Sequence, residues 1–268
     1  MIAERPPSGY DENSASGEPE QPTHKWDQKE MSFTEHLREL RNRLFICIIT
    51  IGVLAAALFW PAQFAIPWMT HEYFPTIRLH AFSPADVILT EFKVSIYGAL
   101  VLGLPVVLYQ VWMFIVPVFH PKTRRMVYAY VAPSIFLGAC GLAFAHFIVL
   151  PRVTAALLKI TDQVAESTFG IEPTLNIILI MLAAFALVFQ TPVIMVLLAR
   201  IGVINVPMLR KYRRYALMGI LIIAGLLAPD GSPLTMAMLA VPMAVLYEVS
   251  IVVITLLEKT WKREDAAL

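Results

Sequence analysis

Charged side chains are scarce in this sequence, since Asp, Glu, Lys and Arg together make up only 15% of its 268 residues. A soluble domain carries about 25%. Hydrophobic residues reach 58%, and the mean hydropathy is +0.67. With so few polar side chains to cover a surface in water, the composition excludes an ordinary soluble domain. It predicts an all-α membrane protein that crosses the bilayer several times.

Cysteine and catalytic motifs are also nearly absent. Cys47 and Cys140 both lie in apolar runs, which excludes a disulfide framework or a metal knuckle and indicates small core residues. The HExxH, GxSxG and Walker motifs of hydrolases and nucleotide-binding enzymes do not occur. We therefore expect no enzymatic activity, no cofactor, no metal and no nucleic-acid partner.

The first thirty residues differ from the rest of the chain. They are rich in Pro, Ser, Gly and acids and contain no apolar core of a signal peptide. Such a segment buries too little surface to offset the entropy of ordering. We expect a disordered cytoplasmic tail over residues 1–30, a transmembrane domain over 31–258 and a short cytoplasmic tail over 259–268.

Six apolar segments predict six transmembrane helices. They cover residues 44–60 (ending at Pro61), 92–118, 126–150, 175–201, 215–228 and 234–257, with an amphipathic helix expected after Pro151. The first four are long enough to cross about 30 Å of hydrocarbon. The fifth is short, and Glu248 interrupts the sixth, so we expect short fifth and sixth helices beside a thinned bilayer or a buried Glu248. The alternative is one long, tilted sixth helix whose internal Glu has a partner.

Basic residues set the expected orientation. With the N-terminus inside, fourteen Lys or Arg fall in or near inner segments and four in outer ones, and the remaining three lie on the distal tail. Positive charge favours the cytoplasmic side, which gives N-in and C-in in the cytoplasmic (inner) membrane. Gln110 lies inside the second apolar run, where lipid offers no hydrogen-bond partner, so it should face protein or a bound chain.

Four stretches in order resemble one known family. They are HLRELRNRL at 36–44, the run 93–125 with its PVVLYQVWMF core and Arg124–Arg125 pair, GLAFAHFIVLPR at 141–152, and APD at 228–230 followed by AVPMAVLYE at 240–248. Together they resemble TatC, the multispanning subunit of the twin-arginine protein translocase. The resemblance covers nearly everything but the tail.

The resemblance implies both a fold and a function. The fold would be a curved, cup-like bundle of six helices. The function would be a receptor that binds twin-arginine signal peptides of folded precursors at the cytoplasmic membrane face. It would recruit single-span TatA/TatB-like subunits for export driven by the proton-motive force, and would form homo-oligomers within the complex.

A twin-arginine receptor needs acids at the membrane edge, because guanidiniums present planar forks that match carboxylates. Glu39 meets this description, and the resemblance places it in contact with the signal peptide. The alternative is a helical salt bridge to Arg43, worth about 0.3–0.5 kcal/mol if exposed. The family usually has a second acid where this chain has Thr123. Glu35, four residues before Glu39, is a candidate substitute; otherwise it is a solvated helix residue.

Further residues of the inner face are candidates for the same site. Arg41, Arg124 and Arg125 would contact the polar part of the peptide or anionic headgroups, or simply anchor the helices. Gln110 and Phe114 lie one helical turn apart, which suits a ledge for a peptide, although core packing explains Phe114 as well.

A second group is predicted to contact partner helices. Gln190 lies within the fourth apolar run, either facing a partner's helix or joining helices internally. The resemblance adds Pro67 and Asp230 on the outer side, and Glu248 completes the group. Two other functions stay open: a small secondary transporter, disfavoured because broken repeats are missing, and a membrane scaffold without peptide recognition, compatible with Thr123.

Overall fold

Helices make up almost all of the structure. The computed structural model describes residues 33–115, 124–162, 168–228 and 231–265, and within these the only strand-like pairing is an isolated bridge between His80 and Gly170. The chain divides into two units, Met1–Arg38 and Glu39–Leu268. The described part of the first unit is the beginning of one helix, and the predicted tail over 1–30 lies outside the described residues. All contacts below belong to the second unit.

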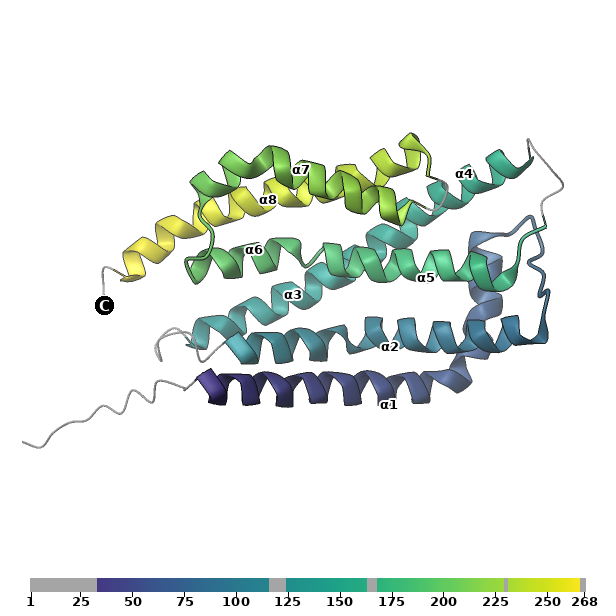
Figure 1. Ribbon diagram of the computed structural model, residues 1–268, viewed down its shortest axis with the longest axis horizontal. Helices are drawn as coiled ribbons and strands as arrows, with labels where there is room; N and C mark the ends of the chain where they lie inside the picture. The colour runs from purple at the N-terminus through teal and green to yellow at the C-terminus, as the bar shows by residue number, and fades with distance from the viewer. Residues whose placement is uncertain (1–32, 116–123, 163–167, 229–230, 266–268) are drawn as a thin grey trace, which may run out of the picture. The chain divides into compact units, whose positions relative to one another are not determined.

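Most of the helices are long and apolar (Figure 1). They are α1 (Phe33–Tyr73), α2 (Pro84–Ile115), α3 (Arg124–Phe144), the π-helical turn η2 (Ala145–Val149), α4 (Leu150–Asp162), α5 (Ile171–Val188), α6 (Thr191–Arg200), α7 (Val206–Leu227) and α8 (Pro233–Asp265). The predicted all-helical class is therefore confirmed.

Among the described residues, five helical stretches are long and apolar enough to cross a membrane. They are Glu35–Tyr73, Pro84–Phe114, Val131–Lys159, Ile171–Arg200 and Thr235–Glu258. They correspond to the first, second, third, fourth and sixth predicted segments. The fifth predicted segment lies in α7, so a sixth crossing stays a prediction.

The first predicted segment was given the wrong end. We expected it to stop at Pro61, but α1 continues through Pro61 and Pro67 to Tyr73. A proline removes one backbone hydrogen bond and bends a helix without always ending it. Buried Ala62, Ile66 and Met69 hold this continuation against the core. The connection between α1 and α2 is residues 74–83.

The sixth helix is also not short. α8 has 33 residues and runs without a break past Glu248. Arg213 of α7 pairs with Glu248, with 2.6 Å between Nε and Oε1, so the carboxylate has a partner and does not end the helix. One long sixth helix with a paired Glu agrees with the alternative, whereas its tilt and the thickness of the bilayer stay predictions. α7 has 22 residues, but its first turns hold Arg210, Lys211 and Arg213, so its apolar part spans only about 20 Å.

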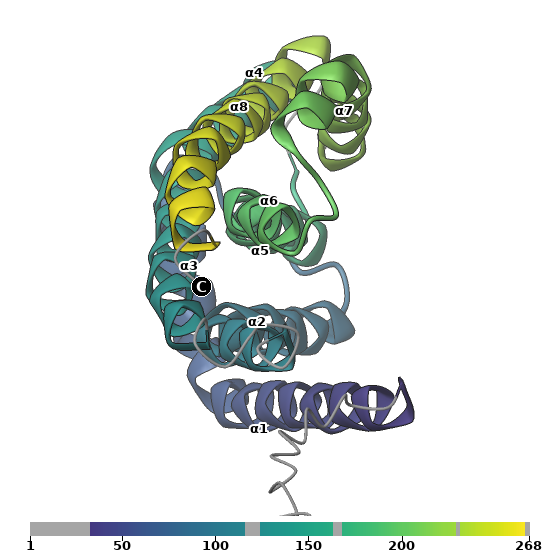
Figure 2. The ribbon, with the colours of Figure 1, turned by 90° about the vertical axis from the view of Figure 1, so that its left-hand side faces the viewer.

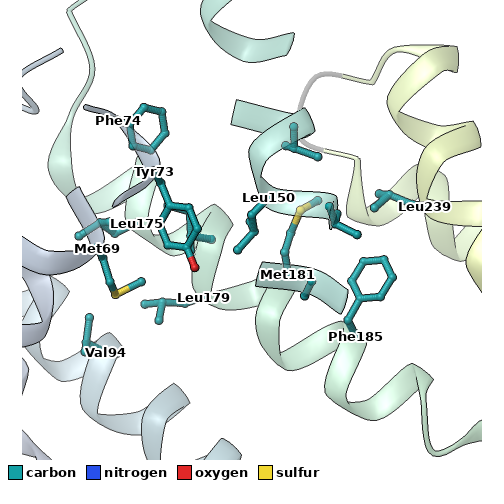
Figure 3. Close-up of a cluster of buried hydrophobic side chains, with 14 of the residues drawn as sticks. Met69, Tyr73, Phe74, Val94, Leu150, Leu175, Leu179, Met181, Phe185 and Leu239 are labelled. Carbon is teal, nitrogen blue, oxygen red and sulfur yellow. The ribbon is translucent and has the colours of Figure 1, made fainter. Parts of the chain in front are cut away.

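α5 lies at the centre of the packing. It contacts α2 and α3, while α6 contacts α8. Seen along their axes, α5 and α6 lie between α2 and the α7–α8 pair (Figure 2). α5 and α6 form one apolar run that breaks at Phe189 and Gln190, with Pro192 opening α6. Buried side chains of α5 meet those of neighbouring helices in the main core (Figure 3). The largest fully buried side chains of this core are Leu150, Leu175, Ile178, Met181, Phe185 and Leu239.

Close approach of α3 and α5 depends on a glycine. A Cβ at Gly141 would lie 2.6 Å from the backbone oxygen of Phe185. Beyond this contact the chain passes through η2 directly into α4, where Leu150 and Val153 are buried. The amphipathic helix predicted after Pro151 is therefore present, as a continuation of the third helix.

Candidate functional site

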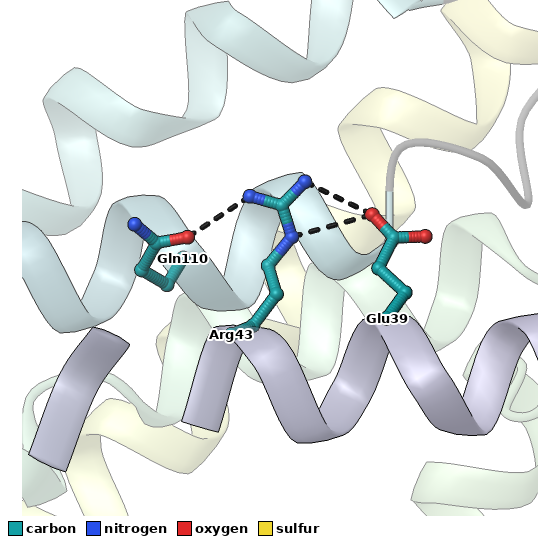
Figure 4. Close-up of polar contacts among 3 residues, drawn as sticks. All are labelled: Glu39, Arg43 and Gln110. Atoms are coloured by element: carbon teal, nitrogen blue, oxygen red, sulfur yellow. Dashed lines mark hydrogen bonds and ion pairs between the residues drawn. The ribbon is translucent and has the colours of Figure 1, made fainter. Parts of the chain in front are cut away.

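Three side chains join α1 to α2 near one end of both helices. Arg43 donates from Nε and Nη2 to Glu39 Oε1, at 3.3 and 2.9 Å, across one turn of α1. Its third nitrogen, Nη1, donates to Gln110 Oε1 of α2 at 2.9 Å. The guanidinium thus bridges a carboxylate and an amide on two helices (Figure 4).

This cluster is largely shielded from solvent. The side chain of Glu39 is 18% exposed, that of Arg43 is 23% exposed, and Gln110 is buried. Glu39 Oε2 is itself buried and has no hydrogen-bond partner among the described residues. A desolvated carboxylate oxygen without a donor is unfavourable. The site therefore retains an acceptor suited to a cationic donor.

Two glycines of α2 face leucine side chains of α1. A Cβ at Gly98 would lie 3.3 Å from Leu58 Cδ1, and one at Gly103 would lie 3.4 Å from Leu54 Cδ1. These α1 side chains occupy the space that larger residues on α2 would fill. Arg43 and Gln110 meet between the two helices through their long side chains.

The structure shows fewer contacts for the remaining predicted site residues. Arg41 is exposed on α1, and Phe114 is half-buried on α2, one turn after Gln110. Glu35 is exposed in the first turn of α1, in the first unit. Arg124 and Arg125 open α3. Thr123 and Asp230 lie outside the described residues.

Gln190 joins helices inside the second unit. It is buried, and its Nε2 donates to the backbone oxygen of Ser134 on α3 at 3.2 Å. Ser134 Oγ accepts from Trp112 Nε1 of α2 at 3.0 Å. Within the part of the chain that is described, Gln190 Oε1 has no hydrogen-bond partner. Three helices are thus connected by polar groups in an apolar interior.

Two other residues predicted to contact partner helices are described: one is exposed, and the other already has a partner. Pro67 is exposed on α1, and Glu248 pairs with Arg213 as described above. Next to this pair, Tyr247 donates its hydroxyl to the backbone oxygen of Leu209 at 2.9 Å. α7 and α8 are therefore held together by two polar contacts.

Sequence reasoning missed two polar clusters. Tyr73 at the end of α1 and His146 in η2 are hydrogen-bonded, with 2.7 Å from the hydroxyl to Nδ1, and Trp68 stacks on the imidazole. Lys93 of α2 forms an ion pair with Glu172 of α5. The only signal for either was a His or Lys within an apolar run, which does not identify its partner.

Long apolar helices whose polar side chains pair with one another define a multi-pass α-helical membrane protein. Comparison with known families is more specific. The family model described as Sec-independent protein translocase protein (TatC) matches residues 35–242. The chain belongs to the TatC family, a component of protein-transport machinery, so the resemblance predicted from the sequence is confirmed.

Individual relatives agree over most of their length. TatC of Aquifex aeolicus (strain VF5) is 32% identical over 226 residues, covering 82% of this chain and 93% of that protein. TatCy of Bacillus subtilis (strain 168) is 33% identical, covering 84% and 89%. A crystal structure of the twin arginine translocase receptor TatC superposes with a TM-score of 0.74 at 30% identity, covering 83% of this chain and 99% of that one.

Proposed function

We propose that this chain is the receptor subunit of a twin-arginine translocase. It binds twin-arginine signal peptides of folded precursors at the cytoplasmic membrane face. It recruits single-span TatA/TatB-like subunits, associates with further copies of itself, and supports export driven by the proton-motive force. The half-buried Glu39, with one carboxylate oxygen lacking a donor among the described residues, is the observation that carries this proposal.

The orientation that this function needs has six crossings with both termini in the cytoplasm. α7 is the fifth crossing, and its basic first turns lie at the cytoplasmic edge with the other inner Lys and Arg. Residues 1–30 and 259–268 form cytoplasmic tails around the domain 31–258. The cytoplasmic (inner) membrane is the compartment, and the helices form a curved cup.

The peptide site centres on Glu39 and extends along α1 and α2. Gln110 supplies an uncharged acceptor, and Phe114, one turn further on, supplies an apolar surface for the peptide. Arg41, Arg124 and Arg125 bind the polar part of the peptide or lipid headgroups. Glu35 supplies the second acid that Thr123 does not.

Partner helices contact the second group of predicted residues. Pro67 is exposed on α1, and Asp230 is proposed as a second outer contact. Glu248 remains partly exposed beside Arg213. Gln190 offers its Oε1, which has no partner among the described residues, to a partner helix that displaces the neighbouring side chains. The hydrogen bond from its Nε2 to Ser134 favours the alternative role of joining helices within the chain.

The test is binding of two purified signal peptides, one with Arg-Arg and one with Lys-Lys, to the detergent-solubilised protein. We expect wild type to prefer Arg-Arg, and Glu39→Gln to weaken that binding about 10- to 100-fold, because a charge-assisted hydrogen bond is lost. Glu258→Gln is the charge-matched control and should bind like wild type. Unchanged binding by a folded Glu39→Gln protein would contradict the proposal.

A further inference from the structure

We propose that Arg43 is an internal occupant of the twin-arginine site, holding a guanidinium position that one arginine of the signal peptide takes over. This inference rests on the proposed receptor function and adds how the site selects its ligand. Its basis is that Arg43 carries the same chemical group as the expected ligand and already binds the predicted acid.

The contacts of Arg43 are those of a bound guanidinium. Three of its nitrogens donate to two acceptors on different helices, Glu39 Oε1 and Gln110 Oε1, over distances of 2.9–3.3 Å. A planar fork serves both acceptors at once, whereas a lysine ammonium is a compact point charge. The position is therefore selective for arginine over lysine.

A second guanidinium position lies beside the first. Arg43 uses only Oε1 of Glu39, and Oε2 is buried without a partner among the described residues. A carboxylate has lone pairs for about four donors. One acid can thus accept hydrogen bonds from two adjacent guanidiniums.

Binding of a paired ligand then proceeds by exchange. One arginine of the peptide donates to Oε2 of Glu39, and the other displaces Arg43 from Oε1 and from Gln110. The displaced guanidinium moves to solvent or lipid headgroups, since Arg43 is already partly exposed. A Lys-Lys ligand has the same charge but cannot replace the fork contacts, so Arg43 remains in place. Arg43 therefore weakens binding of an Arg-Arg ligand and leaves binding of a Lys-Lys ligand nearly unchanged.

The opposite role is that Arg43 positions Glu39 for the peptide. The two roles predict effects of opposite sign on peptide binding by Arg43→Gln.

The test measures the affinities of the Arg-Arg and Lys-Lys signal peptides for wild type and Arg43→Gln in detergent. With competition removed, Arg-Arg binding should tighten roughly tenfold, and Lys-Lys binding should change less than about twofold. Weaker Arg-Arg binding would overturn the proposal, as would an equal gain for both peptides, which is the result of charge alone.

Three variants complete the experiment. Arg43→Lys keeps the charge but loses the fork, so it should tighten Arg-Arg binding by a smaller factor, and it carries the test if Arg43→Gln does not fold. Arg210→Gln removes one exposed positive charge elsewhere and should leave both affinities unchanged. In Glu39→Gln the further change Arg43→Gln should alter Arg-Arg binding much less, because the carboxylate for which Arg43 and the ligand compete is gone.

These outcomes separate the inference from the function on which it rests. If wild type binds Arg-Arg and Lys-Lys equally, receptor function itself is contradicted. If wild type prefers Arg-Arg and Arg43→Gln shows no selective gain, only the role of Arg43 is wrong. A gain for Arg210→Gln equal to that for Arg43→Gln would also overturn it.

Discussion

Gln190 illustrates what a single polar side chain does in the apolar interior. It donates to the backbone oxygen of Ser134, so its role depends on the amide nitrogen. The sequence placed a polar residue within the run 175–201 but gave no partner, because the partner is a backbone atom on another helix. Glu39 could be proposed as a site residue from its sequence context, and that role stays a prediction. The bridging role of Arg43 was not, since it depends on the distance between α1 and α2.

At this scale we predict that Gln190→Glu destabilises the protein more than Gln190→Leu. Leucine removes one hydrogen bond, worth about 1 kcal/mol, and fills the space. Glutamate puts a buried carboxylate against the carbonyl oxygen of Ser134, which adds repulsion and a desolvation cost. Thermal unfolding in detergent measures the difference. A variant Gln190→Glu as stable as Gln190→Leu would contradict the cost assigned to the buried carboxylate.

Helices and their breaks show which features follow from local sequence. Runs of apolar residues predicted all five candidate spans, and the break between α5 and α6 falls at Gln190, just before Pro192. The end of α1 was predicted wrongly, and the continuity of α8 was only one of two alternatives. Both depend on tertiary contacts: the packing of Met69 and its neighbours, and the Arg213–Glu248 pair. A local pattern cannot contain information about a partner on another helix.

The contact between α3 and α5 gives a prediction at the scale of the element. Gly141→Ala should destabilise the protein by about 1–3 kcal/mol, because the new Cβ would overlap the backbone oxygen of Phe185 and push the helices apart. Gly219→Ala in α7 is the matched control, since a Cβ there has no neighbour within 4 Å. That control should be neutral or more stable, because alanine favours a helix. Urea or thermal unfolding in detergent compares them, and equal effects would show that the close approach is unimportant.

For the whole molecule, the proposed topology requires α7 to cross the bilayer. After Cys47 and Cys140 are replaced by Ala, single cysteines report the side of each loop to a membrane-impermeant maleimide in intact cells. Ser232→Cys, between α7 and α8, should be labelled, and Val203→Cys, between α6 and α7, should react only after lysis. Ala81→Cys, between α1 and α2, is the positive control. Labelling of Val203→Cys and Ser232→Cys from the same side would show that α7 does not cross the bilayer and would contradict a topology with six crossings.

The pairing of Arg213 with Glu248 has a consequence for biosynthesis. The apolar part of α7 is too short to enter the bilayer stably by itself, and α8 carries a carboxylate that needs a counter-ion. α8 supplies the apolar contact that the short α7 lacks, and α7 supplies the counter-ion that Glu248 needs. The two helices should therefore leave the insertion machinery together as one hairpin. A nascent chain halted before residue 248 would keep α7 outside the bilayer, and its insertion would wait until the following helix has been synthesised.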